Sequence, residues 1–126
     1  MGSRSLPVPV VAVKRIYEES SPDDGQRILV DRVWPRGVSR VDAALDQWLP
    51  EVGPSDGLRR WFGHDPDRWA EFQRRYRAEL ADNPAWAELV ALVTDHPSTL
   101  LFGARDTAHN QAVVLATVLA ELDQPD

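Results

Sequence analysis

The sequence predicts a small α/β domain with about three mostly parallel strands and helices packed over the sheet. Two short runs, residues 27–34 and 99–104, contain the consecutive apolar residues typical of strands that are buried on both faces. More than sixty residues of mostly helical pattern separate these runs, and a connection of this length indicates a parallel pair. A chain of 126 residues suits one domain with a core of ordinary size.

The predicted boundaries divide the chain into three parts. We expect residues 1–9 to form a flexible N-terminal arm, residues 10–122 to form the single domain and residues 123–126 to form a short tail. The domain begins with an alternating, β-branched segment at 10–17, which predicts the first strand. The link to the second strand is short, so the relative direction of these two strands stays open.

A turn precedes the second strand. In the stretch SSPDDG, Ser21 is expected to cap a single helical turn that Gly25 closes. The alternation within the second strand would place Asp31 and Arg32 on opposite faces of the sheet. Each of these charges then needs its own partner, because an unpaired charge on a buried strand is costly.

The first predicted helices follow the second strand. A capping box at Ser39 predicts a helix that stops at Pro50. Its expected inward side chains are Val41, Leu45, Trp48 and Leu49. A short helix then opens at Pro54 and ends at Gly63, which is expected to adopt a left-handed conformation.

Three longer helices complete the prediction. The clearest covers residues 66–81, and the next begins at Pro84 and ends before Pro97. The last is expected to be capped by Asp106 or Thr107. The expected inward positions on these three helices are Trp69, Phe72, Tyr76 and Leu80; Trp86, Leu89, Val90 and Val93; and Val114, Leu115, Val118, Leu119 and Leu122.

Composition excludes several classes of protein. The chain has no cysteine, which excludes disulfides and thiolate chemistry and fits a cytoplasmic location. Its three histidines are too far apart for a metal motif, and neither GxGxxG nor GxxxxGK occurs, so no metal or cofactor is expected. No window is apolar enough to span a membrane. A net charge of −6 disfavours nucleic acid as a partner.

The segment DRVWPRG is the sharpest candidate for a site. Ligands of open parallel sheets bind beyond the carboxyl ends of the strands, where this segment and residues 103–110 are predicted to lie. Gly37 would let the backbone approach a ligand, and the helix start behind it would favour an anion. Arg36 and Arg40 would add charge-assisted hydrogen bonds. The alternative is a rigid turn with Trp34 as part of the core.

Further candidates lie along the chain. Asp31, His64 and His109 are the residue types that could transfer protons. For each of them a structural role, either in an ion pair or in helix capping, is the alternative. Within the DRVWPRG segment, Arg32 and Trp34 could also contact a ligand, and Trp61, Asp106 and Asn110 could do so from elsewhere in the chain.

Four blocks of sequence carry a resemblance that covers residues 11–122. They read DGQRILVDRVWPRGVS, ALDQWL, PSDGLRRWFGHDPDRWAEFQRRYRAEL and TLLFGARDTAHNQAVVL. In their order and spacing these blocks closely resemble the YeaO-like family of bacterial proteins, which is known as domain of unknown function 488. The resemblance implies a compact cytosolic α/β domain and carries no established reaction with it.

Two functions of different classes remain. The first is a domain or enzyme that binds a small anion, such as a phosphate or nucleotide-like ligand, at the carboxyl ends of the strands. The second is an interaction or regulatory module that uses an Arg/Trp surface to contact a protein partner. A concave pocket lined by Asp31, Arg36 and Asn110 would favour the first, whereas a flat exposed patch around Trp34 or Trp61 would favour the second. Whether the protein is an enzyme is left open by the sequence.

Overall fold

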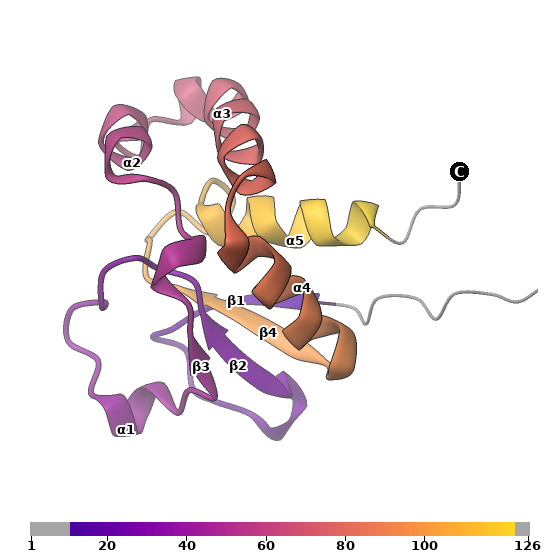
Figure 1. Ribbon diagram of the computed structural model, residues 1–126. Coiled ribbons are helices and arrows are strands. Elements are labelled where there is room, and N and C mark those ends of the chain that lie inside the picture. The colour runs from indigo at the N-terminus through magenta and orange to yellow at the C-terminus, as the bar shows by residue number, and fades with distance from the viewer. Residues whose placement is uncertain (1–10, 123–126) are drawn as a thin grey trace, which may run out of the picture.

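The computed structural model of the protein describes residues 11–122, so the expected arm and tail lie outside the described residues. Figure 1 shows one sheet with helices stacked mainly on one side of it. The strands are β1 (Val11–Arg15), β2 (Gln26–Leu29), β3 (Gln47–Trp48) and β4 (Ser98–Phe102). The α-helices are α1 (Arg40–Ala43), α2 (Asp56–Phe62), α3 (Trp69–Ala81), α4 (Pro84–Asp95) and α5 (Gln111–Glu121). Single 3-10 turns form η1 (Pro22–Asp24), η2 (Pro50–Val52) and η3 (Pro66–Arg68).

The four strands are all parallel and lie in the order β1-β4-β2-β3. The predicted fold class is therefore confirmed, with one strand more than expected. β4 lies between β1 and β2, so these two strands run parallel without pairing. All five residues of β4 are buried, as the continuous apolar run of a central strand predicts. Because the strands are parallel, their carboxyl ends share one edge of the sheet.

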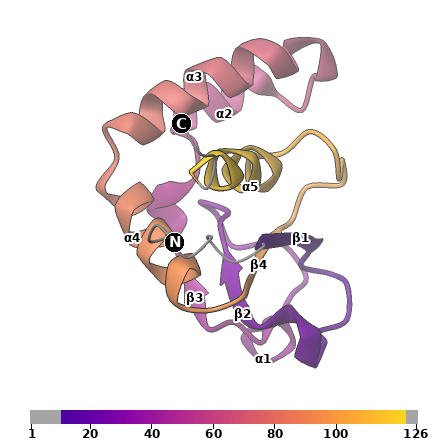
Figure 2. The same ribbon diagram turned by 90° about the vertical axis from the view of Figure 1, so that its right-hand side faces the viewer.

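The two faces of the sheet are covered unequally. Helices α2 to α5 lie over one face, and the short α1 lies below the other (Figure 2). Side chains alternate between the faces: Ile28 and Leu100 join the large core under the helices, whereas Leu29 and Leu101 join a small second core. The second core is completed by Trp34, from the segment between β2 and β3, and by Trp48 of β3 itself.

The helix expected between Ser39 and Pro50 is much shorter than predicted. It ends after Ala43, because Ala44 adopts a left-handed conformation, and residues 47–48 form β3 instead. Val41, which was expected to face inward, is 86% exposed. The Ser39 cap itself is present, since its side chain accepts a hydrogen bond from the backbone N–H of Asp42.

A buried arginine explains the early end of α1. The Arg27 guanidinium, on β2, donates hydrogen bonds to the carbonyls of Ala43 and Ala44, which satisfies the free carbonyls at the end of this helix. Asp46 then pairs with the backbone of Arg27 through both its N–H and its carboxylate. These contacts bring residues 47–48 alongside β2, and no local pattern in the sequence indicates them.

The second strand also ends earlier than predicted. β2 stops at Leu29, so Asp31 and Arg32 lie beyond the strand and not on opposite faces of it. Arg32 turns towards the loop after η2, where its guanidinium donates to the carbonyls of Gly53 and Pro54 at 2.8 and 2.9 Å. The strand end is thus tied to a loop twenty residues further along the chain.

The remaining elements agree with the sequence more closely. The turn at η1 has the expected Ser21 capping box, and Gly63 ends α2 in a left-handed conformation. Residues 66–68 form η3 ahead of α3, whose side chains Phe72, Tyr76 and Leu80 are buried and Trp69 is half-buried. On α4, Leu89 and Val93 are buried.

The last helix starts later than predicted. Its cap is Asn110, whose side chain accepts a hydrogen bond from the N–H of Val113, and not Asp106 or Thr107. Leu122, expected inside, is 50% exposed. Among residues 11–122, no helix has the length and apolar character that crossing a bilayer requires.

Candidate functional site

A cleft with a cavity volume of about 660 Å³ opens at the carboxyl ends of β1, β2 and β4. We call it the strand-end cleft. Segments that follow these three strands form one side of it, including Tyr17, Trp34 and Gly103. Phe62 and Phe72, from α2 and α3, close it from the helical layer. Its size lies within the range usual for small-molecule sites.

The strand-end cleft is basic although the protein is acidic. Five arginines line it, namely Arg15, Arg32, Arg36, Arg59 and Arg105. Asp31 is the only carboxylate among the described residues that line it. The whole chain carries a net charge of −6, so the positive charge of this cleft is a local feature. Clustered charge of one sign between low-dielectric walls raises the local concentration of ligands of opposite charge.

Asp31 lines the cleft and links three segments of the chain: the one after β2, the one after β4 and the start of α5. One carboxylate oxygen accepts a hydrogen bond from the Gly103 N–H at 2.9 Å, and the other accepts one from the side-chain amide of Gln111. Burial raises the pKa of Asp31 to about 6, although these two hydrogen bonds and the charge of Arg59 oppose the rise. The carboxylate is therefore largely ionised at neutral pH and takes up a proton as the pH falls through about 6.

The five arginines fall into two groups. Arg15 and Arg32 donate to backbone carbonyls, and the guanidinium of Arg15 also lies 4.5 Å from the ring centre of Tyr17. Arg59 forms only an exposed ion pair, with Asp56, and Arg36 and Arg105 have no side-chain hydrogen bond or ion pair to any residue in 11–122. The second group can turn towards a ligand without breaking a buried interaction.

Two of the candidate proton-transfer residues are histidines at the rim. His64 lines the cleft, is exposed, and has a left-handed backbone with φ of 58° directly after Gly63. His109 also lines it and holds its Nδ1 at 2.9 Å from the carboxylate of Asp106. The ring of His109 meets that of Trp69 edge to face, with centres 5.1 Å apart. Packing and a hydrogen bond therefore fix His109, whereas His64 is exposed and has its ring centre 6.3 Å from that of Phe62.

Asp106 and Asn110 hold this loop together. The Asp106 carboxylate accepts the N–H groups of Ala108 and His109, and these bonds keep its pKa below the usual range. Asn110 lines the cleft, but its side chain caps α5 and donates to the Asp106 carbonyl. Asp106 does not line the cleft; it orients a residue that does.

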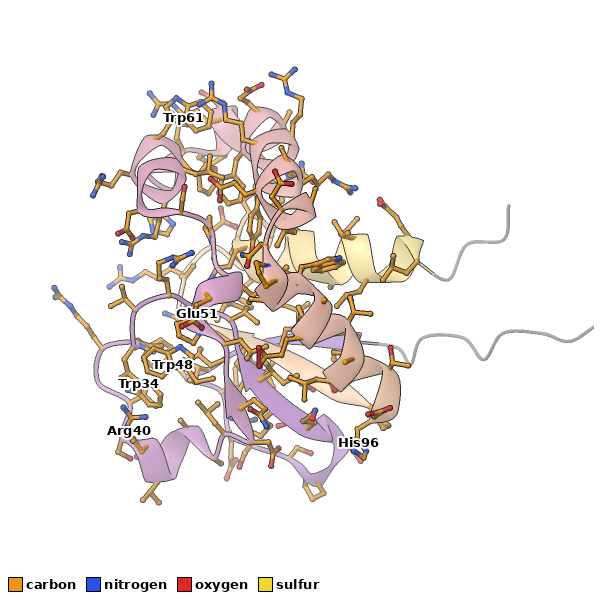
Figure 3. All side chains as sticks on the ribbon, viewed as in Figure 1. Trp34, Arg40, Trp48, Glu51, Trp61 and His96 are labelled. Atoms are coloured by element: carbon orange, nitrogen blue, oxygen red, sulfur yellow. The ribbon has the colours of Figure 1, made fainter. Side chains whose placement is uncertain are left out.

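Gly37, Arg40 and Trp61 lie outside the strand-end cleft, so the anion site expected at the helix after Gly37 would not be part of it. α1 is a single turn, and the Arg40 guanidinium lies over the rings of Trp34 and Trp48, at 4.4 and 5.8 Å from their centres. Figure 3 shows this group at one end of the molecule and Trp61 at the other. Trp61 packs under the guanidinium groups of two arginines of the helical layer.

Of the candidate residues, the structure brings seven to the lining of one cleft: Asp31, Arg32, Trp34, Arg36, His64, His109 and Asn110. Sequence reasoning missed Arg15, Arg59, Arg105 and Gln111. Arg15 is the last residue of β1 and Arg105 lies three residues after β4, so the rule that ligands bind at carboxyl ends could have indicated them. Arg59 and Gln111 come from helices, and only the packing of those helices brings them to the cleft. Within residues 11–122, no three His, Asp or Glu side chains are grouped so as to hold a metal ion.

Comparison with known proteins shows the family of the chain. Residues 10–126 match the model of a family described as the inactive DUF488-N3 subclade. The uncharacterised protein Rv3073c of Mycobacterium tuberculosis is 45% identical over 109 residues, which cover 86% of this chain and 92% of that protein. The uncharacterised protein YeaO of Escherichia coli is 42% identical over 113 residues, which cover 89% and 98%. No solved structure matches the chain significantly. The chain belongs to the YeaO-like family of DUF488 proteins, in the subclade described as inactive.

Proposed function

We propose that the protein binds a small anion, such as a phosphate or nucleotide-like ligand, in the strand-end cleft. The observation that carries this proposal is the set of five arginines around one concave site in a chain of net charge −6. Arg36, Arg59 and Arg105 supply the contacts, because none of them is held by a buried partner among the described residues. Arginine presents a planar fork that matches phosphate and carboxylate oxygens.

The role we propose is binding and not catalysis. The description of the subclade as inactive supports this choice. Asp31, His64 and His109 then act as polar contacts in the cleft and not as general acids or bases. We also place the protein in the cytoplasm, a choice supported by its lack of cysteine.

A concave site favours a small ligand over a protein partner. Asp31, Arg36 and Asn110 line the same cleft. Trp34 and Trp61, the residues that an interaction surface would present, are each half-buried beneath arginine side chains. The second hypothesis, an Arg/Trp docking module, therefore has less support.

A thermal-shift screen tests the proposal. The compounds are inorganic phosphate, nucleotides, sugar phosphates and small carboxylates. A ligand present at ~100 times its dissociation constant should add roughly 2.7 kcal/mol, a shift on the order of 10 °C for a domain of this size. Arg36→Ala should remove the shift.

The matched control is Arg74→Ala, because Arg74 is an exposed arginine that forms an ion pair with Glu71 on its own helix. This variant should keep the full shift. A compound that stabilises both variants equally would place its binding site elsewhere and contradict the proposal, as would the failure of every compound to stabilise the wild type.

A further inference from the structure

The Asp31 carboxylate has no positively charged partner. No ion pair with it is present among residues 11–122, although five arginines line the same cleft. Its two hydrogen-bond donors, the Gly103 N–H and the Gln111 amide, are both neutral. Arg32, the next residue in the chain, is engaged elsewhere, because it donates to two backbone carbonyls of another loop. The fold thus keeps a partly buried carboxylate without an ion pair, and the charge of Arg59 acts on it only from a distance.

The carboxylate still has room for another donor. An ionised carboxylate offers about four acceptor positions, and the two hydrogen bonds within the protein occupy only two of them. Asp31 also lines the cavity itself, so the remaining positions can face a ligand. A purely structural link between Gly103 and Gln111 would not need a charge, because a neutral amide can accept one hydrogen bond and donate another.

A simple anion would satisfy only the arginines of this cleft and not Asp31. The arginines attract its negative charge, but Asp31 repels it from the floor of the same cavity. A ligand that also carries a positive charge removes this conflict and provides the cation that Asp31 lacks. Charge-assisted hydrogen bonds to an ionised group are about twice as strong as neutral ones.

We propose that the ligand is amphoteric, with an ammonium group that binds the Asp31 carboxylate and an acid group that binds the free arginines at the rim, Arg36, Arg59 and Arg105. This inference rests on the proposed function and narrows its ligand class to small molecules that carry both a phosphate or carboxylate and an amine. In this proposal the arginines bind the acid group, and Asp31 selects those acids that also carry an ammonium group.

A matched pair of probes tests this inference by calorimetry near neutral pH. Ethyl phosphate carries only the acid, and 2-aminoethyl phosphate adds an ammonium group to nearly the same skeleton. The longer 3-aminopropyl phosphate covers a wider spacing between the two groups. We expect an aminoalkyl phosphate to bind the wild type at least ~10-fold more tightly than ethyl phosphate, which corresponds to about 1.4 kcal/mol.

Two variants separate the contributions. Asp31→Asn keeps the shape of the side chain and removes its charge, so the preference for the aminoalkyl phosphate should vanish while ethyl phosphate binds as well as before or better. Arg36→Ala should weaken all three probes. Equal binding of ethyl phosphate and both aminoalkyl phosphates to the wild type would overturn the ammonium site and leave the anion site intact. Failure of all three probes to bind would overturn both proposals.

Discussion

Replacing Asp31 with asparagine should stabilise the protein above about pH 6. The amide has the same shape as the carboxylate, and after rotation of the Gln111 amide it can accept from the Gly103 N–H and donate to Gln111. The variant has no charge at this position, so the free-energy cost of burying one disappears. That same cost raises the pKa of Asp31 to about 6. The change is therefore expected to act through charge and not through packing.

The size of the effect follows from the pKa. A rise from the ordinary value of 3.8 to about 6 corresponds to about 3 kcal/mol, since each pKa unit is worth about 1.4 kcal/mol. The folded state holds the proton more tightly than the unfolded state. The stabilisation by protonated Asp31 is therefore fully present below 3.8 and is lost as the pH rises through about 6. Ionised Asp31 thus lowers the free energy of unfolding near neutral pH.

Urea unfolding of both proteins across a pH series measures this directly. The difference in unfolding free energy between Asp31→Asn and the wild type should rise by most of that amount, roughly 2–3 kcal/mol, between about pH 4 and about pH 7.5. Other titrating groups cancel in the difference. A difference that stays constant with pH would refute the reasoning, because it would mean that the Asp31 carboxylate ionises equally easily in the folded and unfolded chains.

Three further substitutions probe the contacts that shape the cleft. Arg32→Ala leaves two backbone carbonyls without their donor and should cost roughly 1–3 kcal/mol in urea unfolding. Tyr76→Phe removes the hydrogen bond from a fully buried hydroxyl to the Val52 carbonyl and should cost about 1–2 kcal/mol, whereas an unchanged unfolding midpoint would contradict that assignment. Gly103→Ala would place a Cβ 2.9 Å from a carboxylate oxygen at the cleft floor and should cost roughly 1–3 kcal/mol, whereas Gly57→Ala on α2, with no atom within 4 Å, should be neutral or stabilising.

The sequence predicted those elements whose signals are local. The apolar stripe Phe72, Tyr76 and Leu80 and the left-handed Gly63 depend only on neighbouring residues, and both agree with the structure. The predicted length of the helix after Ser39 was wrong for the opposite reason, because Arg27, which lies on β2, binds the carbonyl at the end of the helix. The apolar periodicity after Ser39 reports only on residues close in sequence, so it could not reveal this contact with β2.

The start of α5 was ambiguous in a different way. Asp106 and Asn110 can both cap a helix, and both do accept backbone N–H groups in the structure. The Asp106 carboxylate closes a tight turn, and the helix begins only at Asn110, which also bonds back to the Asp106 carbonyl. The local propensities of the two side chains do not distinguish these roles.

The candidate site likewise contains residues that the sequence could place and others that it could not. The DRVWPRG segment could be placed at a strand end from its position after an apolar run, and Arg36 does line the cleft. Arg40 is also an arginine of this part of the chain, yet its guanidinium stacks on the ring of Trp34 outside the cleft. Arg15 joins the site only because β4 lies between β1 and β2, an order that sequence patterns did not determine.

The most direct test of an anion site in the strand-end cleft is a nuclear magnetic resonance titration of the ¹⁵N-labelled protein with inorganic phosphate. We expect the largest saturable shifts at the backbone amides of Arg36 and Gly103 and at the side-chain amide of Gln111, three groups in or beside the cleft. The amides around His96, at the other end of the sheet from the cleft, should stay unchanged (Figure 3). Shifts confined to residues outside the cleft, or no saturable shift at all, would contradict the account.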